Sequence, residues 1–111
     1  MGINKKIFTE ILKSGKILHS NTLSLRFIQP PKNVLTLPNQ YLFVVSLKVS
    51  KLATERNLLK RRSRDIINKH KNLIKKPLIC VFFFKPAAIN LNYNELNKEI
   101  VMILKQARLI K

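Results

Sequence analysis

Three stretches of the chain have the hydrophobic pattern of β-strands. In residues 23–28, apolar and polar residues alternate, which is typical of a strand with one buried face. Residues 41–46 are rich in aromatic and β-branched side chains and predict a central strand. Residues 78–84 are continuously apolar, the pattern of a strand covered on both faces. Residues 16–22 are expected either to extend the first strand or to pair with it, and the proline-rich residues 29–39 to form a connection.

Helical spacing of apolar residues predicts three helices. A short amphipathic helix is expected over residues 5–14, a long one over residues 54–72 and a last one over residues 94–108, with Asn92 or Asn94 as its cap. The order is therefore helix, strands, long helix, strand, helix. A chain of 111 residues fits a single domain spanning its whole length, with a modest core.

The long helix has two different sides when it is wound at about 100° per residue. Leu58, Leu59 and Ile66 fall together on one side and predict its buried face. The nearly opposite side carries Arg56, Asn57, Lys60, Arg61 and Arg64. Such a helix packs its apolar side on the protein and presents guanidinium and ammonium groups to a polyanion such as phosphate.

The net charge strengthens this interpretation. The chain has 22 basic and five acidic residues, a charge of +17, and 11 of the basic residues fall within residues 48–76. Charge repulsion of this size is relieved by an anionic partner, and nucleic acid is the expected one. A membrane is disfavoured, because the apolar side of the long helix has no Trp or Phe and the longest apolar run is far shorter than a membrane span. Without a signal-peptide pattern, a cytoplasmic protein is expected.

The residues needed for an active site are scarce. Glu95 and Glu99 are one helical turn apart and are expected to lie on a plain helix surface. His19 and His70 have no metal-ligand spacing around them, and Cys80 is the only cysteine. With two glycines in the chain, a glycine-rich phosphate loop is excluded. If the protein takes part in catalysis, the catalyst is expected to be elsewhere.

The aromatic residues divide between core and candidate binding roles. Phe82 and Phe84, alternate residues of one apolar strand, are predicted to be core, and the phenylalanines of this strand are not expected to form a stacking surface. Helical spacing makes Phe8 core as well, although a short helix beside a sheet can also leave one aromatic ring at a groove where a base stacks. Phe27 and Tyr41 fit either role.

These residues together resemble the bacterial ribonuclease P protein component. That family has a strand ending in a Val-Val-Ser triplet, a lysine pair, and a helix with an Arg-Asn-Arg signature, a Lys-Arg pair and an Arg followed by an acidic residue. The matching residues are Val44, Val45, Ser46, Lys48, Arg56, Asn57, Lys60, Arg61, Arg64 and Asp65. Matches in the flanks are Phe8, Gly15, Lys85, Pro86, Tyr93 and Glu95.

Four positions depart from the family pattern. Leu58 replaces the second arginine of the signature, and Leu47 replaces one lysine of the pair. Leu12 and Arg26 occupy positions that are often aromatic, which leaves Phe8 as the main aromatic residue of the groove.

The resemblance implies a two-layer α/β sandwich. It has a mixed four-stranded sheet, N- and C-terminal helices, and the long cationic helix in a left-handed crossover between two strands. This hand is opposite to the general preference for right-handed crossovers.

The resemblance also implies a function. Family members bind a catalytic RNA, which holds the catalytic Mg²⁺ ions, and the complex removes the 5′ leader of precursor tRNA. The residues implied to bind the RNA subunit are Lys48, Lys51, Arg56, Asn57, Lys60, Arg61 and Arg64. Those implied to line a groove for the leader are Phe8, Leu12, Arg26 and Ser46. No catalytic residue and no metal ligand is implied in the protein.

A second interpretation is a basic RNA-binding protein of the ribosomal type, with no part in cleavage. Such a protein needs basic residues, but it does not need Arg-Asn followed by Lys-Arg between two strands. The motif therefore favours the ribonuclease P subunit.

Overall fold

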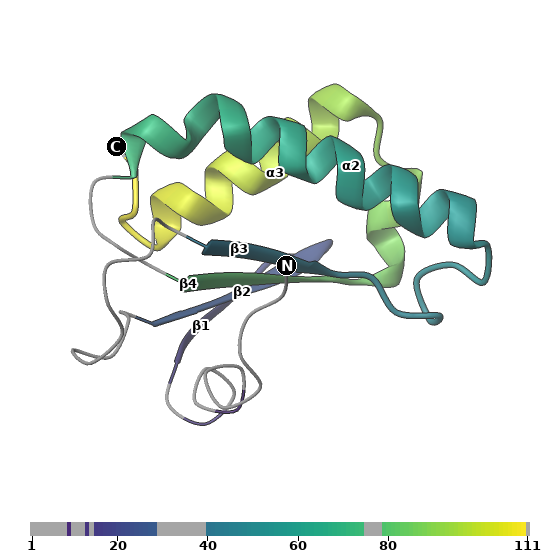
Figure 1. Cartoon of the computed structure of the whole chain (residues 1–111), viewed down its shortest axis with the longest axis horizontal. Helices are drawn as coiled ribbons and strands as arrows, with labels where there is room; N and C mark the ends of the chain where they lie inside the picture. The colour runs from purple at the N-terminus through teal and green to yellow at the C-terminus, as the bar shows by residue number, and fades with distance from the viewer. Residues whose placement is uncertain (1–8, 10–12, 14, 29–39, 75–78, 111) are drawn as a thin grey trace.

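The computed structural model describes Thr9, Lys13 and residues 15–28, 40–74 and 79–110. One sheet forms the first layer, and two helices lie side by side across one of its faces as the second layer (Figure 1). The elements are β1 (Lys16–His19), β2 (Leu23–Ile28), β3 (Gln40–Val44), α2 (Ala53–His70), η1 (Lys71–Leu73), β4 (Ile79–Phe84), η2 (Pro86–Asn90) and α3 (Tyr93–Gln106). The α/β two-layer sandwich is confirmed.

Most element predictions are confirmed within a few residues. Of the two alternatives for residues 16–22, the pairing one is correct, because β1 pairs with β2. The predicted long helix ends at His70, and the chain continues as the 3-10 helix η1. In the predicted first helix, Thr9 and Lys13 are helical, and its other residues up to Ser14 lie outside the described part, as do residues 29–39.

The sheet is mixed, with the strand order β1-β2-β4-β3. β2 is antiparallel to both β1 and β4, whereas β3 and β4 are parallel neighbours. The chain between these parallel strands contains α2, so the implied crossover is present, and its left-handedness stays a prediction. The prediction that β3 is central is wrong, because it is an edge strand in the sheet of described residues. β3 is apolar because its side chains pack on both faces of the sheet. This composition reports how the faces are covered and does not report how many strands pair with β3.

The main core lies between the sheet and the two helices. Alternate residues of the strands point to this side of the sheet, the helix face, and Phe82 is fully buried there with its ring stacked on Phe43 at 5.3 Å between centroids. Phe84 is buried in the same cluster, so the prediction for both phenylalanines is confirmed. Phe27 and Tyr41, which fitted either role, pack partly buried against this core. α3 contributes Leu96, Ile100, Ile103 and Leu104.

The intervening residues form a smaller cluster on the sheet surface that points away from α2 and α3, which we call the second face. Ile79 and Val81 of β4 are buried in it, and the partly buried residues packed against them are Ile28, Leu42, Val44 and Phe83. Both faces of β4 are therefore apolar and packed, as its continuous apolar run predicts.

α3 begins with a local cap and is joined to the segment before β2 by a hydrogen bond from its middle. It begins at Asn92, which forms a capping box with Glu95: the Asn92 side chain accepts from the Glu95 amide at 2.8 Å, and the Glu95 carboxylate accepts from the Asn92 amide at 3.0 Å. Glu99 is half-buried and accepts a hydrogen bond from the Thr22 hydroxyl at the start of β2. Both carboxylates lie on the surface of α3, as predicted: Glu95 is exposed and Glu99 half-buried, and each also has a structural hydrogen-bond partner.

No helix in the described residues has the length and apolar character needed to cross a membrane.

Candidate nucleic-acid interface

The start of α2 is organised by Ser50, two residues before the helix cap. Leu52 occupies the cap position and provides no side-chain hydrogen bond. The Ser50 hydroxyl instead accepts from the Leu52 amide at 3.1 Å and donates to the Glu55 carboxylate. The Ser50 carbonyl accepts from the Arg56 guanidinium at 3.0 Å. These bonds fix the turn that leads into α2 and hold Arg56 against it.

The buried side of α2 consists of Leu59, Ser63, Ile66 and Ile67. The polar Ser63 side chain can be buried because its hydroxyl donates a hydrogen bond to the Leu59 carbonyl one turn earlier, at 2.8 Å. Leu58 was predicted to lie on this side, and that prediction is wrong: its side chain is 38% exposed. Leu58 directly precedes Leu59, the first residue of the buried side, and successive residues of a helix are about 100° apart. The Leu58 side chain therefore points toward solvent.

The exposed side of α2 carries the predicted RNA-binding residues. Asn57, Arg61 and Arg64 are exposed, and Arg56 and Lys60 are half-buried at the edge of the buried stripe. We call these five residues the cationic face. Within the described part of the chain, Lys60, Arg61 and Arg64 form no ion pair. The exposed Lys48 and Lys51 lie in the loop that leads into α2, so all seven residues occupy one continuous segment.

This surface suits phosphate. Arginine presents a planar fork of N–H donors that matches phosphate oxygens in pairs, and lysine adds a point charge. The two carboxylates of α2, Glu55 and Asp65, already have hydrogen-bond partners of their own. The positive charge of the cationic face is therefore left for an external anion.

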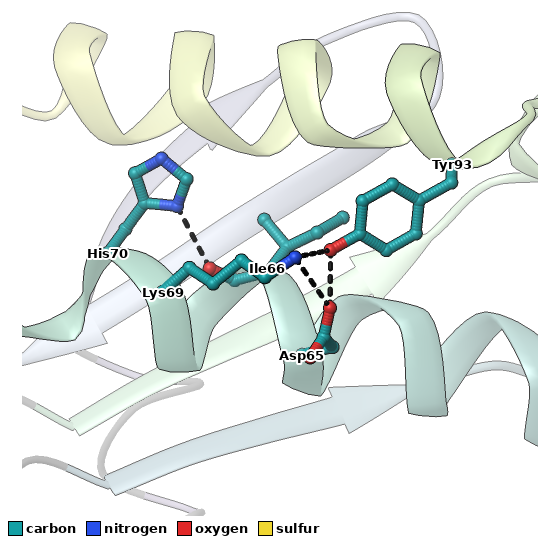
Figure 2. A network of polar contacts seen from close by, with 5 residues as sticks. All are labelled: Asp65, Ile66, Lys69, His70 and Tyr93. Carbon is teal, nitrogen blue, oxygen red and sulfur yellow. Dashed lines mark hydrogen bonds and ion pairs between the residues drawn. The ribbon is translucent and has the colours of Figure 1, made fainter.

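The far part of α2 is connected to the first residue of α3 by a polar network, shown in Figure 2. The Tyr93 hydroxyl donates to the Asp65 carboxylate and accepts from the Lys69 ammonium group at 3.0 Å. Lys69 and Asp65 also form an ion pair at 3.3 Å, and the Lys69 ammonium lies 5.2 Å from the centre of the Tyr93 ring. On the same helix, His70 Nδ1 donates to the Ile66 carbonyl at 2.9 Å. Lys69 is thus engaged within the protein, unlike the cations of the cationic face.

The network shifts the pKa of both charged groups. The hydrogen bond from Tyr93, followed by that from Lys69, lowers the pKa of the Asp65 carboxyl. The hydrogen bond with Tyr93, followed by that with Asp65, raises the pKa of Lys69. Because a lowered carboxyl pKa favours the ionised form in the folded state, the stabilisation by Asp65 is present above its unfolded pKa and is lost as the pH falls through its folded pKa.

Replacing Tyr93 by Phe is expected to raise the Asp65 pKa toward the ordinary carboxyl value of about 3.9, because the largest cause of the shift is removed. The phenyl ring remains as a contact for Lys69, so the variant isolates the hydroxyl. A titration of the Asp65 carboxyl carbon by NMR measures the change. An unchanged Asp65 pKa would show that Tyr93 does not donate to this carboxylate in solution.

The residues implied to line the leader groove are only partly described. Phe8 and Leu12 lie outside the described residues. Arg26 is half-buried on β2, and its guanidinium carbon lies 5.5 Å from the centre of the Phe83 ring on β4. Ser46 is exposed just beyond the end of β3. The contact of Arg26 with Phe83 depends on the pairing of β2 with β4, so the sequence did not suggest it.

The described residues contain no group of three His, Cys, Asp or Glu side chains that could hold a metal ion. Cys80 is buried in β4, and burial raises the pKa of its thiol to about 12. This cysteine is therefore a protonated core residue rather than a nucleophile.

Comparisons with known proteins agree with the motif. The family model described as Ribonuclease P matches residues 3–108. The chain is 28% identical over 107 residues to the ribonuclease P protein component of Microcystis aeruginosa, covering 96% of this chain and 89% of that protein. It is 31% identical over 103 residues to the ribonuclease P protein component of a Pseudanabaena species, covering 93% and 86%. The solved structure of the Staphylococcus aureus RNase P protein matches with a TM-score of 0.85 over 98% of this chain and 95% of that one, at 19% identity.

The family match includes α2 with its cationic face and every strand of the sheet. It also disfavours the alternative of a ribosomal-type protein. The chain therefore belongs to the ribonuclease P protein family and is the protein subunit that associates with the ribonuclease P RNA in a tRNA-processing endoribonuclease holoenzyme.

Proposed function

We propose that the protein binds the ribonuclease P RNA through the cationic face of α2 and through Lys48 and Lys51. The observation that carries this proposal is the set of cations on one exposed helix side for which the described residues supply no ion-pair partner. Guanidinium groups that have no carboxylate partner are available for phosphate oxygens.

The substrate of the complex is precursor tRNA, and the protein contacts its 5′ leader as a single strand. The second face of the sheet is the surface for the leader, supported by Arg26 on β2, with Phe8, Leu12 and Ser46 as further groove residues. Single-stranded RNA binds where positive charge is combined with flat side chains for stacking. Cleavage takes place on the RNA subunit, which holds the Mg²⁺ ions, in the cytoplasm of the cell.

Reconstitution tests this function. The purified chain is mixed with ribonuclease P RNA at limiting Mg²⁺, and removal of the leader from precursor tRNA is followed over time. The protein is expected to accelerate leader removal by the RNA and to cleave nothing without it. An RNA that works equally fast with and without the protein would contradict the proposal.

Replacing Arg61 by Ala is expected to weaken assembly with the RNA subunit or docking of the precursor tRNA, whatever the length of its leader, because one phosphate contact is lost. The slope of log affinity against log salt should become smaller by about 1. Circular dichroism should be unchanged, since the side chain is exposed.

The matched control is Lys98→Ala, which removes one positive charge from an exposed position of α3. It should leave the salt slope close to that of the original protein. Equal effects of both changes would mean that total charge, rather than the cationic face, determines binding. A loss of helical signal in Arg61→Ala would show that this residue is structural.

A further inference from the structure

The second face of the sheet brings a cation and an aromatic ring together. In the register of β2 and β4, Ser24 lies opposite Phe83, and Arg26 lies opposite Val81. Arg26 is therefore a diagonal neighbour of Phe83 on the same face, and its guanidinium carbon is 5.5 Å from the ring centre. A cation within about 6 Å of an aromatic centroid is attracted by the ring. Phe83 thus restrains the guanidinium above β4.

Both side chains of this pair retain contact with solvent. Arg26 and Phe83 are half-buried, in contrast to Val81 beside them, which is fully buried. The same cross-strand row continues from Phe83 to Val44 on β3 and, through Ser24, to the exposed His19 on β1. The pair therefore lies within a continuous strip across all four strands.

The charge of this strip favours an anionic ligand. The basic residues on this face of the strands are Arg26 and His19, whereas Lys16 lies opposite Phe27 and so belongs to the helix face; the four strands contain no carboxylate. The carboxylates of the described residues belong to α2 and α3, which cover the other face of the sheet. A nucleic-acid strand on the second face meets positive charge without an acidic neighbour from the sheet.

We propose that Arg26 and Phe83 act together as one platform for a nucleobase of the leader: Phe83 positions the guanidinium, and an unpaired base stacks on it. The inference rests on the proposed function, in which the second face receives the leader. Unpaired bases stack on aromatic rings and on guanidinium planes, and they do so with little dependence on sequence. The aromatic group of this part of the groove then comes from β4, whereas the family pattern would place it at position 26 on β2.

The measurement is the ratio of two affinities, for precursor tRNA and for mature tRNA, with the holoenzyme assembled from the full chain and ribonuclease P RNA. Replacing Arg26 by Ala is expected to reduce the preference for the precursor by about 5- to 150-fold, the range for one stacked base. Mature tRNA has no leader and should bind as before. Arg26→Lys keeps the charge without the planar group and should also lose preference, which separates stacking from charge.

The role of Phe83 is tested through its coupling to Arg26. Phe83→Leu should weaken the preference, and the double variant with Arg26→Ala should be no weaker than Arg26→Ala alone, because Phe83 acts through the guanidinium. Phe83→Tyr keeps the ring and should bind the precursor like the original protein. The matched control is Phe27→Leu, the same substitution at a half-buried residue on the helix face, which should leave the ratio unchanged.

The possible outcomes lead to different conclusions. If the original holoenzyme does not prefer the precursor, the proposed leader contact itself is wrong. If it does, but Arg26→Ala keeps the full preference, the leader is bound elsewhere and the platform is wrong. Independent losses that multiply in the double variant would contradict positioning by Phe83. Should Phe83→Leu fail to fold, Arg26→Ala, Arg26→Lys and Phe83→Tyr still decide the question.

Discussion

Binding of the protein to ribonuclease P RNA is expected to weaken by about 1,000-fold between roughly 50 and 200 mM salt. A protein that makes about six phosphate contacts releases a similar number of condensed counterions from the RNA. A higher salt concentration makes this release less favourable and so lowers the affinity. The proposed contacts supply six cations, which are Lys48, Lys51, Arg56, Lys60, Arg61 and Arg64. Lys60, Arg61 and Arg64 form no ion pair with the described residues, so their charge is available to phosphate.

A titration of the RNA subunit at several monovalent salt concentrations measures this effect. Mg²⁺ is held constant, and the circular dichroism of the RNA is recorded at each salt concentration as a control for its folding. A plot of log affinity against log salt with a slope magnitude below about 2 would contradict the electrostatic interpretation of the cationic face.

Replacing Phe82 by Ala is expected to lower the free energy of unfolding by about 3–5 kcal/mol. Phe82 has no exposed surface, and its ring stacks on Phe43 in the centre of the core between sheet and helices. Because a domain of this size is stable by only about 5–15 kcal/mol, the variant should be close to unfolding. RNA binding should fail as a consequence, since α2 loses the sheet on which it packs.

Urea unfolding followed by circular dichroism provides the free energy of unfolding. Phe82→Leu is the matched comparison, because it retains most of the apolar volume and should cost clearly less than Phe82→Ala. A cost below about 1 kcal/mol for Phe82→Ala would mean that the core collapses around the missing ring or that this side chain is not buried in solution.

The elements that were predicted from the sequence are those with a strong local pattern. Alternating or continuous apolar residues identify β2 and β4, and helical spacing identifies α2 and α3. The cationic face could also be predicted, because its basic residues follow one another at helical spacing within a single element. The exception in α2 is Leu58, whose apolar side chain points to solvent at the border of the buried stripe.

Features that depend on distant residues could not be predicted. The position of β3 at the edge of the sheet follows from which strands pair, and its own residues do not encode their neighbours. The bond from Tyr93 to Asp65 joins two helices, and the contact of Arg26 with Phe83 joins two strands. Ser63 would be assigned to the surface by its polarity, and only its hydrogen bond to Leu59 explains why it is buried.

The strand order has a consequence for how the protein folds during synthesis. β4 lies between β2 and β3, which do not pair with each other, and it is the last strand of the sheet to be made. Until Ile79–Phe84 has left the ribosome, β3 has no described strand to pair with, β2 is paired with β1 alone, and α2 has only part of the surface that later buries it. Contacts between segments so far apart in sequence form slowly, because a long loop must close first. A nascent chain that stops before β4 therefore carries its most basic segment, α2, before β4 and α3 have been made to complete the surface on which it packs, while it is still close to ribosomal RNA.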